Sequence, residues 1–190
     1  MKLKTILNEN TGELLVVDVQ PAHQDHITFD LYEFTDYLNS YKGKINYVFN
    51  GPDLGYEDES ELIEWLFEHD LKEETLSNIK FIEKNYGWIR TAIDDGDDEE
   101  IILELLRYMI ENDYMDAREI SEQEKGDLSE NVLDFIDFDD GFCLPNIIDE
   151  MKNFNKCTVV GGGADECLLE MEITLNALNI KNKRNNKFIY

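Results

Sequence analysis

The sequence is poor in positive charge and in long apolar runs. Lysine and arginine number 17 against 43 aspartates and glutamates, which gives a net charge of −26. Such a surface repels phosphates and acidic lipids, so we expect no direct binding of nucleic acid or of a membrane. No charge-free apolar run approaches the roughly 20 residues of a membrane span. The N-terminus soon meets Asn8, Glu9 and Asn10 and is not typical of a signal peptide, so a cytoplasmic protein is predicted.

Cysteine and histidine are also scarce. The three cysteines, Cys143, Cys157 and Cys167, show no CxxC spacing. An odd number without that spacing indicates neither a disulfide framework nor a zinc site, and it fits a reducing compartment. His23 and His26 stand three residues apart and could form a metal pair, but surface polar residues are the favoured interpretation, so no metal site is predicted.

The residues that are present predict one α/β domain over 1–190. Hydrophobic residues make up 42% of the chain, enough for a core. Apolar runs typical of strands alternate with helical patterns, which predicts a parallel sheet covered on both faces. The expected strands are 14–20, 45–50, 79–84, 157–161 and a short 187–190, and the main expected helices are 30–41, 58–70, 97–112, 145–154 and 166–178.

Active sites of parallel sheets lie at the carboxyl ends of the strands. That rule brings together Asp18, Asn50, Lys84 and the segment 161–167, because each ends an expected strand. A cysteine needs a base or a cation to become a thiolate, a lysine stabilises negative charge, and an aspartate can carry a proton. Asp18, Lys84 and Cys167 therefore form a candidate catalytic set.

Cys167 closes the run VVGGGADEC (159–167), which reads as a strand, a tight glycine turn and a helix. A thiol near a helix N-terminus is expected to have a lowered pKa. The amides of Gly163, Ala164 and Cys167 could form an oxyanion hole. Two plainer interpretations stay open: Cys167 is a small buried hydrophobe, and Asp165 with its neighbour only caps the helix.

Three segments resemble the isochorismatase-like cysteine hydrolases, which include the nicotinamidases. LVVDVQP (15–21) is similar to the family's first strand with its Asp-x-Gln ending, and KNYGWIRT (84–91) to its lysine segment. VVGGGADEC is similar to the family's nucleophile run, with Ala164 in place of the usual threonine. The glycine run and the ending FIY (188–190) are also similar to uncharacterised proteins of tailed phages, which implies no function.

The family resemblance implies a three-layer α/β/α fold with a mostly parallel, doubly wound sheet. It implies a triad of Asp18, Lys84 and Cys167 that hydrolyses a small amide or amide-like compound through a thioester, without a metal or organic cofactor. It also implies a turn at Gly162 and Gly163 that serves the substrate carbonyl, and it makes a homo-oligomer plausible. The expected substrate pocket comprises Gln20, Asn50, Tyr86, Trp88, Arg90 and Asp165.

Within that pocket Arg90 could hold a substrate carboxylate, although Trp88 as a core residue and Arg90 as a surface cation are equally acceptable. The sequence also departs from the family pattern. The metal-binding Asp-x-His-x-His arrangement of the nicotinamidase branch is missing after the second strand, where Asn50, Asp53 and Tyr56 stand.

A further departure is the segment 94–150, which is predicted to be a mainly helical insertion. It holds 21 acidic residues against three basic ones. The insertion could be a lid, a partner surface or decoration. The alternative to a hydrolase is therefore a catalytically lapsed member that binds a basic protein through this acidic segment, as a possible polyanion mimic.

Overall fold

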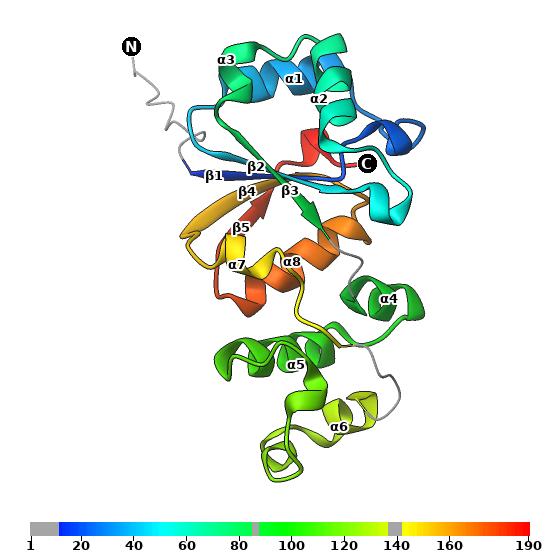
Figure 1. Ribbon diagram of the computed structural model, residues 1–190, viewed down its shortest axis with the longest axis vertical. Helices are drawn as coiled ribbons and strands as arrows, with labels where there is room; N and C mark the ends of the chain where they lie inside the picture. Colours follow the sequence, from blue (N-terminus) through cyan, green and yellow to red (C-terminus); the bar gives the residue numbers. More distant parts are fainter. Residues whose placement is uncertain (1–11, 85–87, 137–141) are drawn as a thin grey trace, which may run out of the picture.

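The expected parallel sheet is present in the computed structural model, which describes residues 12–84, 88–136 and 142–190 (Figure 1). Its order is β3-β2-β1-β4-β5, and every neighbouring pair is parallel. The strands are β1 (Glu13–Val17), β2 (Ile45–Asn50), β3 (Ile79–Lys84), β4 (Lys156–Gly161) and β5 (Lys181–Arg184).

The central strand β1 is apolar because both of its faces are covered. Leu14 and Val16 belong to a core with Phe34 and Leu38 of one helical layer. Their neighbours in β1, Leu15 and Val17, belong to a second core on the other face of the sheet. Successive side chains of a strand point to opposite faces, so a strand buried on both sides reads as a continuous apolar run.

The two helical layers complete a three-layer α/β/α fold. One face carries α1 (Leu31–Ser40), α2 (Glu59–Glu68) and α3 (Glu73–Leu76), and the other carries α7 (Ile148–Met151) and α8 (Cys167–Ala177) (Figure 1). Asp30 and Asp58 begin α1 and α2 by accepting hydrogen bonds from first-turn amides, as N-cap aspartates do.

The segment between β3 and β4 builds an additional helical lobe. It contains α4 (Trp88–Asp95), α5 (Glu99–Glu111) and α6 (Glu130–Ile136), with the short 3₁₀ turns η3 (Ala117–Glu119) and η4 (Glu124–Asp127). The apolar sides of these helices share a core with α8, through Ile173 and Ala177. Figure 1 shows α5 and α6 beyond α8, on its side away from the sheet. Within the described residues, no helix is both long and apolar enough to cross a lipid bilayer.

The end of the chain differs from the prediction. The expected strand 187–190 is instead the 3₁₀ turn η5 (Asn186–Phe188), because Phe188 is buried against the rings of Phe29, Phe34 and Tyr37. The last strand of the sheet is β5, which the sequence did not reveal. Its residues Lys-Asn-Lys-Arg pair only with β4 at the sheet edge and stay largely exposed, so they carry no apolar pattern.

The strand order places a crevice site between β1 and β4. The chain leaves β1 toward the α1 layer and leaves β4 toward the α8 layer, so the connections part at these two neighbouring strands. Such a switch point leaves room at the carboxyl ends of the strands. Asp18 directly follows β1, and the glycine run ends β4.

Candidate active site

Two glycines with left-handed backbone place Cys167 at the first position of α8. Gly161 has φ 81° and Gly162 has φ 64°. A Cβ on Gly161 would stand 2.3 Å from the carbonyl oxygen of Val17, so only glycine lets β4 turn this close to β1. The strand, turn and helix predicted from the sequence are therefore confirmed, and the turn carries the Cys167 thiol to the carboxyl edge of the sheet.

Asp18, Lys84 and Cys167 meet at that edge, as predicted. The ammonium nitrogen of Lys84 lies 2.8 Å from Oδ2 of Asp18. Asp18 is fully buried with φ 50°, and Lys84 is 6% exposed. Among the described residues, neither carboxylate oxygen of Asp18 has a partner in good hydrogen-bonding geometry, although the Lys84 contact is close. The carboxylate thus keeps lone pairs that can accept a proton.

Glu170 is a fourth member of the cluster that the sequence analysis missed. Its Oε2 accepts a hydrogen bond from Lys84 Nζ at 3.0 Å, and the residue is 3% exposed. Burial raises the pKa of Glu170, and the ammonium opposes this. The available signal was a carboxylate one turn after Cys167 and flanked by Leu169 and Met171, since a buried charge needs a partner.

Lys84 carries its charge at neutral pH despite its burial. Burial by itself lowers the pKa of this amine, but the nearby carboxylates of Asp18 and Glu170 outweigh it, so the pKa lies above its usual value. One ammonium therefore lies between two buried carboxyl groups. The charge of Lys84 is shared before any thiolate forms.

The expectation of a lowered thiol pKa is wrong for the unliganded site. Burial and the Asp18 carboxylate raise the pKa of Cys167 to about 12, and Lys84 and Arg90 only partly offset this. The resting form at neutral pH is therefore the thiol. A thiolate has to be made by moving the proton, and the Asp18 carboxylate, which interacts with the thiol, is the candidate acceptor.

Arg90 points at the sulfur of Cys167. Its Nη1 donates to Sγ at 3.2 Å, and its Nη2 lies 3.0 Å from Oε2 of Glu166. Nε lies 2.9 Å from Oδ2 of Asp94, one turn further along α4. Arg90 is thus no isolated surface cation, and each of its guanidinium nitrogens has a partner within the protein. Its role in holding a substrate carboxylate stays a prediction.

The turn supplies fewer free amides than expected. The amide of Ala164 donates to the carbonyl of Tyr190 at 3.0 Å, and the carbonyl of Gly162 accepts from the Tyr190 amide at 3.3 Å. The prediction that the Ala164 amide belongs to an oxyanion hole is therefore wrong, because this amide is already bonded to Tyr190. Within the described ranges, the amides of Gly163 and Cys167 donate to no protein group.

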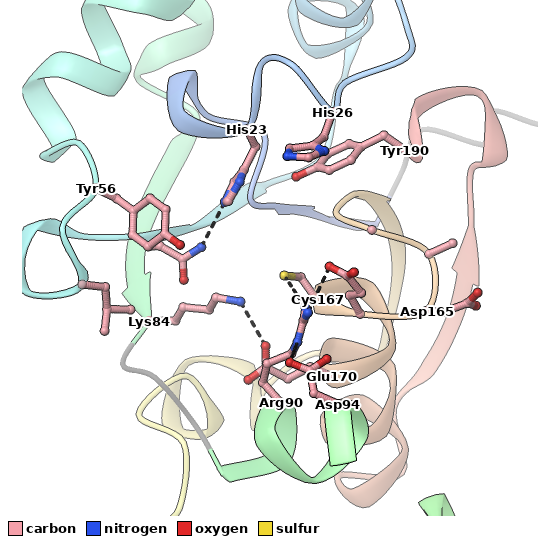
Figure 2. A pocket seen from close by; sticks show the side chains of 15 residues that line it. His23, His26, Tyr56, Lys84, Arg90, Asp94, Asp165, Cys167, Glu170 and Tyr190 are labelled. Carbon is pink, nitrogen blue, oxygen red and sulfur yellow. Dashed lines mark hydrogen bonds and ion pairs between the residues drawn. The ribbon is translucent and has the colours of Figure 1, made fainter. Parts of the chain in front are cut away.

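The site opens into a cavity of about 750 Å³ (Figure 2). A volume of this size fits a small-molecule pocket. The wall is formed at the carboxyl edge of the sheet by His23, His26, Asn50, Leu54, Tyr56, Lys84, Arg90, Asp94, Gly163, Ala164, Asp165, Glu166, Cys167, Glu170 and Tyr190. Of the described residues of the segment 94–150, Asp94 alone belongs to this wall.

Some of the residues predicted to line the pocket belong to its wall, and others do not. Asn50, Arg90 and Asp165 belong to the wall, and Figure 2 shows Asp165 directed away from the sulfur. Gln20 does not belong to it. Its side-chain amide exchanges two hydrogen bonds with the backbone of Asn50, at 2.9 and 3.2 Å, and thereby ties the end of β1 to the end of β2.

Trp88 is corrected from a pocket residue to a core residue. Its indole N–H donates to the carbonyl of Cys143 at 3.0 Å, and its ring packs on Phe135 and Phe142 in the helical lobe. Trp88 and Arg90 therefore lie on different sides of α4. Tyr86, the remaining pocket prediction, lies outside the described residues.

Tyr190 and the two histidines were not predicted as pocket residues. The Tyr190 hydroxyl donates to the backbone carbonyl of Asp18 at 2.8 Å. His23 Nε2 lies 3.4 Å from Asn50 Nδ2, and burial lowers the pKa of His23, so its ring is mainly neutral at pH 7. His26 also lines the cavity. Among the described residues, no group of three or more histidine, cysteine, aspartate or glutamate side chains is arranged to hold a metal ion.

Comparisons of the chain with protein-family models, with curated proteins and with solved structures found no match. The resemblance to isochorismatase-like hydrolases therefore stays a prediction. Its three segments do supply the side chains that meet at the carboxyl edge, Asp18, Lys84 and Cys167.

Proposed function

We propose that the protein is a cysteine hydrolase of the isochorismatase-like type that acts on a small amide or amide-like compound. The observation that carries the proposal is that Asp18, Lys84 and Cys167 lie together at the carboxyl edge of the sheet. Lys84 Nζ lies 2.8 Å from the Asp18 carboxylate. The thiol lines a cavity large enough for a small molecule.

In the first step the Cys167 proton moves to the Asp18 carboxylate as the sulfur attacks the carbonyl carbon. A carbon–sulfur bond forms, and the π electrons of the carbonyl move to its oxygen. Because its pKa is raised, the nucleophile rests as the thiol, so the proton has to leave the sulfur as the carbon–sulfur bond forms.

The negative oxygen of the tetrahedral intermediate needs donors. Gly163, in the turn before α8, and Cys167, the first residue of α8, have amides that donate to no protein group within the described ranges. Free backbone amides, one of them at a helix N-terminus, are suitable donors for an oxyanion hole. Ala164 is not part of it, because its amide is held by Tyr190.

Collapse of the intermediate breaks the carbon–nitrogen bond and leaves a thioester on Cys167. Asp18 returns its proton to the leaving nitrogen, which departs as ammonia or an amine. Water then attacks the thioester and gives a proton to Asp18, and the sulfur leaves and recovers that proton. Lys84, whose nitrogen lies 2.8 and 3.0 Å from the Asp18 and Glu170 carboxyl groups, stabilises the negative charge that remains at the site while Asp18 holds the proton.

The charges of the cavity wall favour a neutral or cationic amide over an anionic one. Two cations, Lys84 and Arg90, face four carboxylic residues of the wall, and Asp18 lies behind them. The carboxylic residues are Asp94, Asp165, Glu166 and Glu170. Arg90 is already paired with two of them, so it offers little attraction to a substrate carboxylate.

Release of ammonia or amine from a panel of small neutral, cationic and anionic primary amides tests the proposal. We expect turnover by the parent, none by Cys167→Ala, and parental turnover by the control Cys143→Ala, whose exposed thiol lies outside the cavity wall. Trapping of a thioester on Cys167 by mass spectrometry would locate the chemistry. Equal turnover by parent and Cys167→Ala would refute it.

A further inference from the structure

The guanidinium of Arg90 is held in one orientation by two carboxylates. Nε pairs with Asp94 at 2.9 Å, Nη2 pairs with Glu166 at 3.0 Å, and Nη1 reaches Cys167 Sγ at 3.2 Å (Figure 2). The group is a rigid planar fork, so fixing two of its nitrogens fixes the direction of the third. The third nitrogen is the one at the sulfur.

The two holding carboxylates come from different parts of the fold. Asp94 follows Arg90 by one turn of α4, and Glu166 immediately precedes Cys167 at the N-cap position of α8, where its side chain makes no capping bond. The side chains of Asp94 and Glu166 are 48% and 59% exposed, so each pair adds little stability. Their effect is to orient the guanidinium across the two helices.

We propose that Arg90 is a catalytic residue that stabilises the Cys167 thiolate through a directed N–H donor, with Asp94 and Glu166 as its positioning residues. The assignment rests on the proposed cysteine chemistry. It adds a second cation to the triad and replaces the expected role of Arg90 as a binder of a substrate carboxylate.

Lys84 alone leaves the sulfur without a charged donor. Its ammonium contacts Asp18 at 2.8 Å and Glu170 at 3.0 Å, and among the described residues it makes no hydrogen bond to Sγ. When the thiol proton moves to Asp18, a negative charge appears on sulfur. Arg90 Nη1 is the charged donor already in contact with that atom.

The thiol is surrounded by several other titratable groups, which any test has to hold constant. They face Cys167 from the ends of β1 and β3, from the turn, from α8, from the segment after β1 and from the last residue, and they are Asp18, Lys84, Glu166, Glu170, His23, His26 and Tyr190. Asp94 of α4 lines the same cavity. Substitutions at Arg90 change none of these residues, but Arg90→Gln also releases Asp94 and Glu166 from their ion pairs, whereas Arg90→Lys keeps a cation beside them.

The test compares the rate of iodoacetamide alkylation of Cys167 as a function of pH in the parent, Arg90→Gln and Arg90→Lys, with the modified site mapped by mass spectrometry. Loss of a hydrogen bond to a charged group corresponds to about one to two pKa units. A more basic thiolate is also a better nucleophile, so the rate falls only about threefold per unit. We expect Arg90→Gln to react about 3- to 10-fold more slowly, and Arg90→Lys to fall between it and the parent.

Two controls isolate the direct contact. Arg107→Gln removes a guanidinium of α5 that donates to the carbonyl of Asn176 in α8, so it perturbs α8 without touching the thiol, and we expect the parental rate. Cys143 serves as an internal reference, because its carbonyl accepts from Trp88 of α4. A parallel slowing at Cys143 would show a displacement of α4 as a whole and would overturn the assignment.

The outcomes separate this inference from the hydrolase proposal. An unchanged Cys167 rate in Arg90→Gln overturns the role of Arg90, whether or not the parent hydrolyses amides. A slower rate in a protein that hydrolyses no amide of the panel supports the thiolate contact and refutes the hydrolase. If Arg90→Gln does not fold, the alkylation rate of Cys167 in Arg90→Lys decides. A parental rate in Arg90→Lys would show that an ammonium suffices and that the directed guanidinium is unnecessary, which overturns the assignment.

Discussion

Lys84 Nζ lies 2.8 Å from Asp18 Oδ2, although β2 separates their strands in the sheet. Both side chains are buried, and Glu170 approaches the same nitrogen at 3.0 Å. The long lysine side chain thus connects the outer strand β3, the central strand β1 and the helix α8 at the carboxyl edge. The stability of the protein should depend on this ammonium, because the two buried carboxyl groups Asp18 and Glu170 share it as their cationic partner.

Lys84→Met is therefore expected to destabilise the protein by about 3–5 kcal/mol, the usual cost of leaving buried charges without their partner. Lys80→Met is the matched control on the same strand, since Lys80 forms an exposed pair with Glu150 that is worth about 0–1 kcal/mol. Urea unfolding of both variants measures the difference. Equal midpoints would mean that the buried cluster adds nothing to stability.

Gly161→Ala is expected to cost about 3 kcal/mol or more. A side chain at φ 81° costs about 1–2 kcal/mol, and the Cβ would also meet the Val17 carbonyl oxygen at 2.3 Å. Gly96→Ala is the control, because Gly96 has φ 82° but open space around its Cβ, so it should cost only the backbone strain. Thermal unfolding separates the two costs, and similar losses would argue against a close approach of β4 to β1.

The raised pKa of Cys167 predicts a pH dependence of stability. Its ordinary value of 9.0 rises to about 12 in the folded state, so the native protein holds this proton more tightly than the unfolded chain does. The contribution to stability is complete below pH 9 and is lost as the pH rises through 12. The free energy of unfolding of the parent should thus fall relative to Cys167→Ser above pH 9. Parallel curves in urea titrations would contradict the raised pKa.

The acidic wall predicts a preference for neutral reagents. The ratio of the iodoacetamide rate to the iodoacetate rate should be larger at Cys167 than for a free thiol in solution. Added salt should bring the ratio at Cys167 closer to that of the free thiol. Asp165→Asn should narrow the ratio modestly, because Asp165 lines the cavity and adds to its negative potential although its side chain is directed away from the sulfur. Asp36→Asn is the control, since Asp36 is exposed on α1 and lies outside the wall. An unchanged ratio in Asp165→Asn would show that this charge does not act on the sulfur.

The convergence of Asp18, Lys84 and Cys167 was predictable because one topological rule suffices for it. Asp18, Lys84 and the glycine run each follow an apolar or alternating segment, and parallel strands present their carboxyl ends at the same edge. Glu170 was not predicted, because its role appears only when Lys84 reaches it from another strand. The strand β5 was missed since an exposed edge strand needs no apolar residues.

The sequence by itself determined the parallel sheet, the glycine turn and the presence of a thiol at the start of α8. These follow from local periodicity and backbone geometry, which act over a few residues. Tertiary structure alone decided the direction of side chains from α4 and the protonation of the thiol. Arg90 points to Cys167 while Trp88 points into the lobe, and burial beside Asp18 outweighs the start of the helix in setting the thiol pKa. Desolvation and contacts between distant segments set these properties, and no window of sequence contains them.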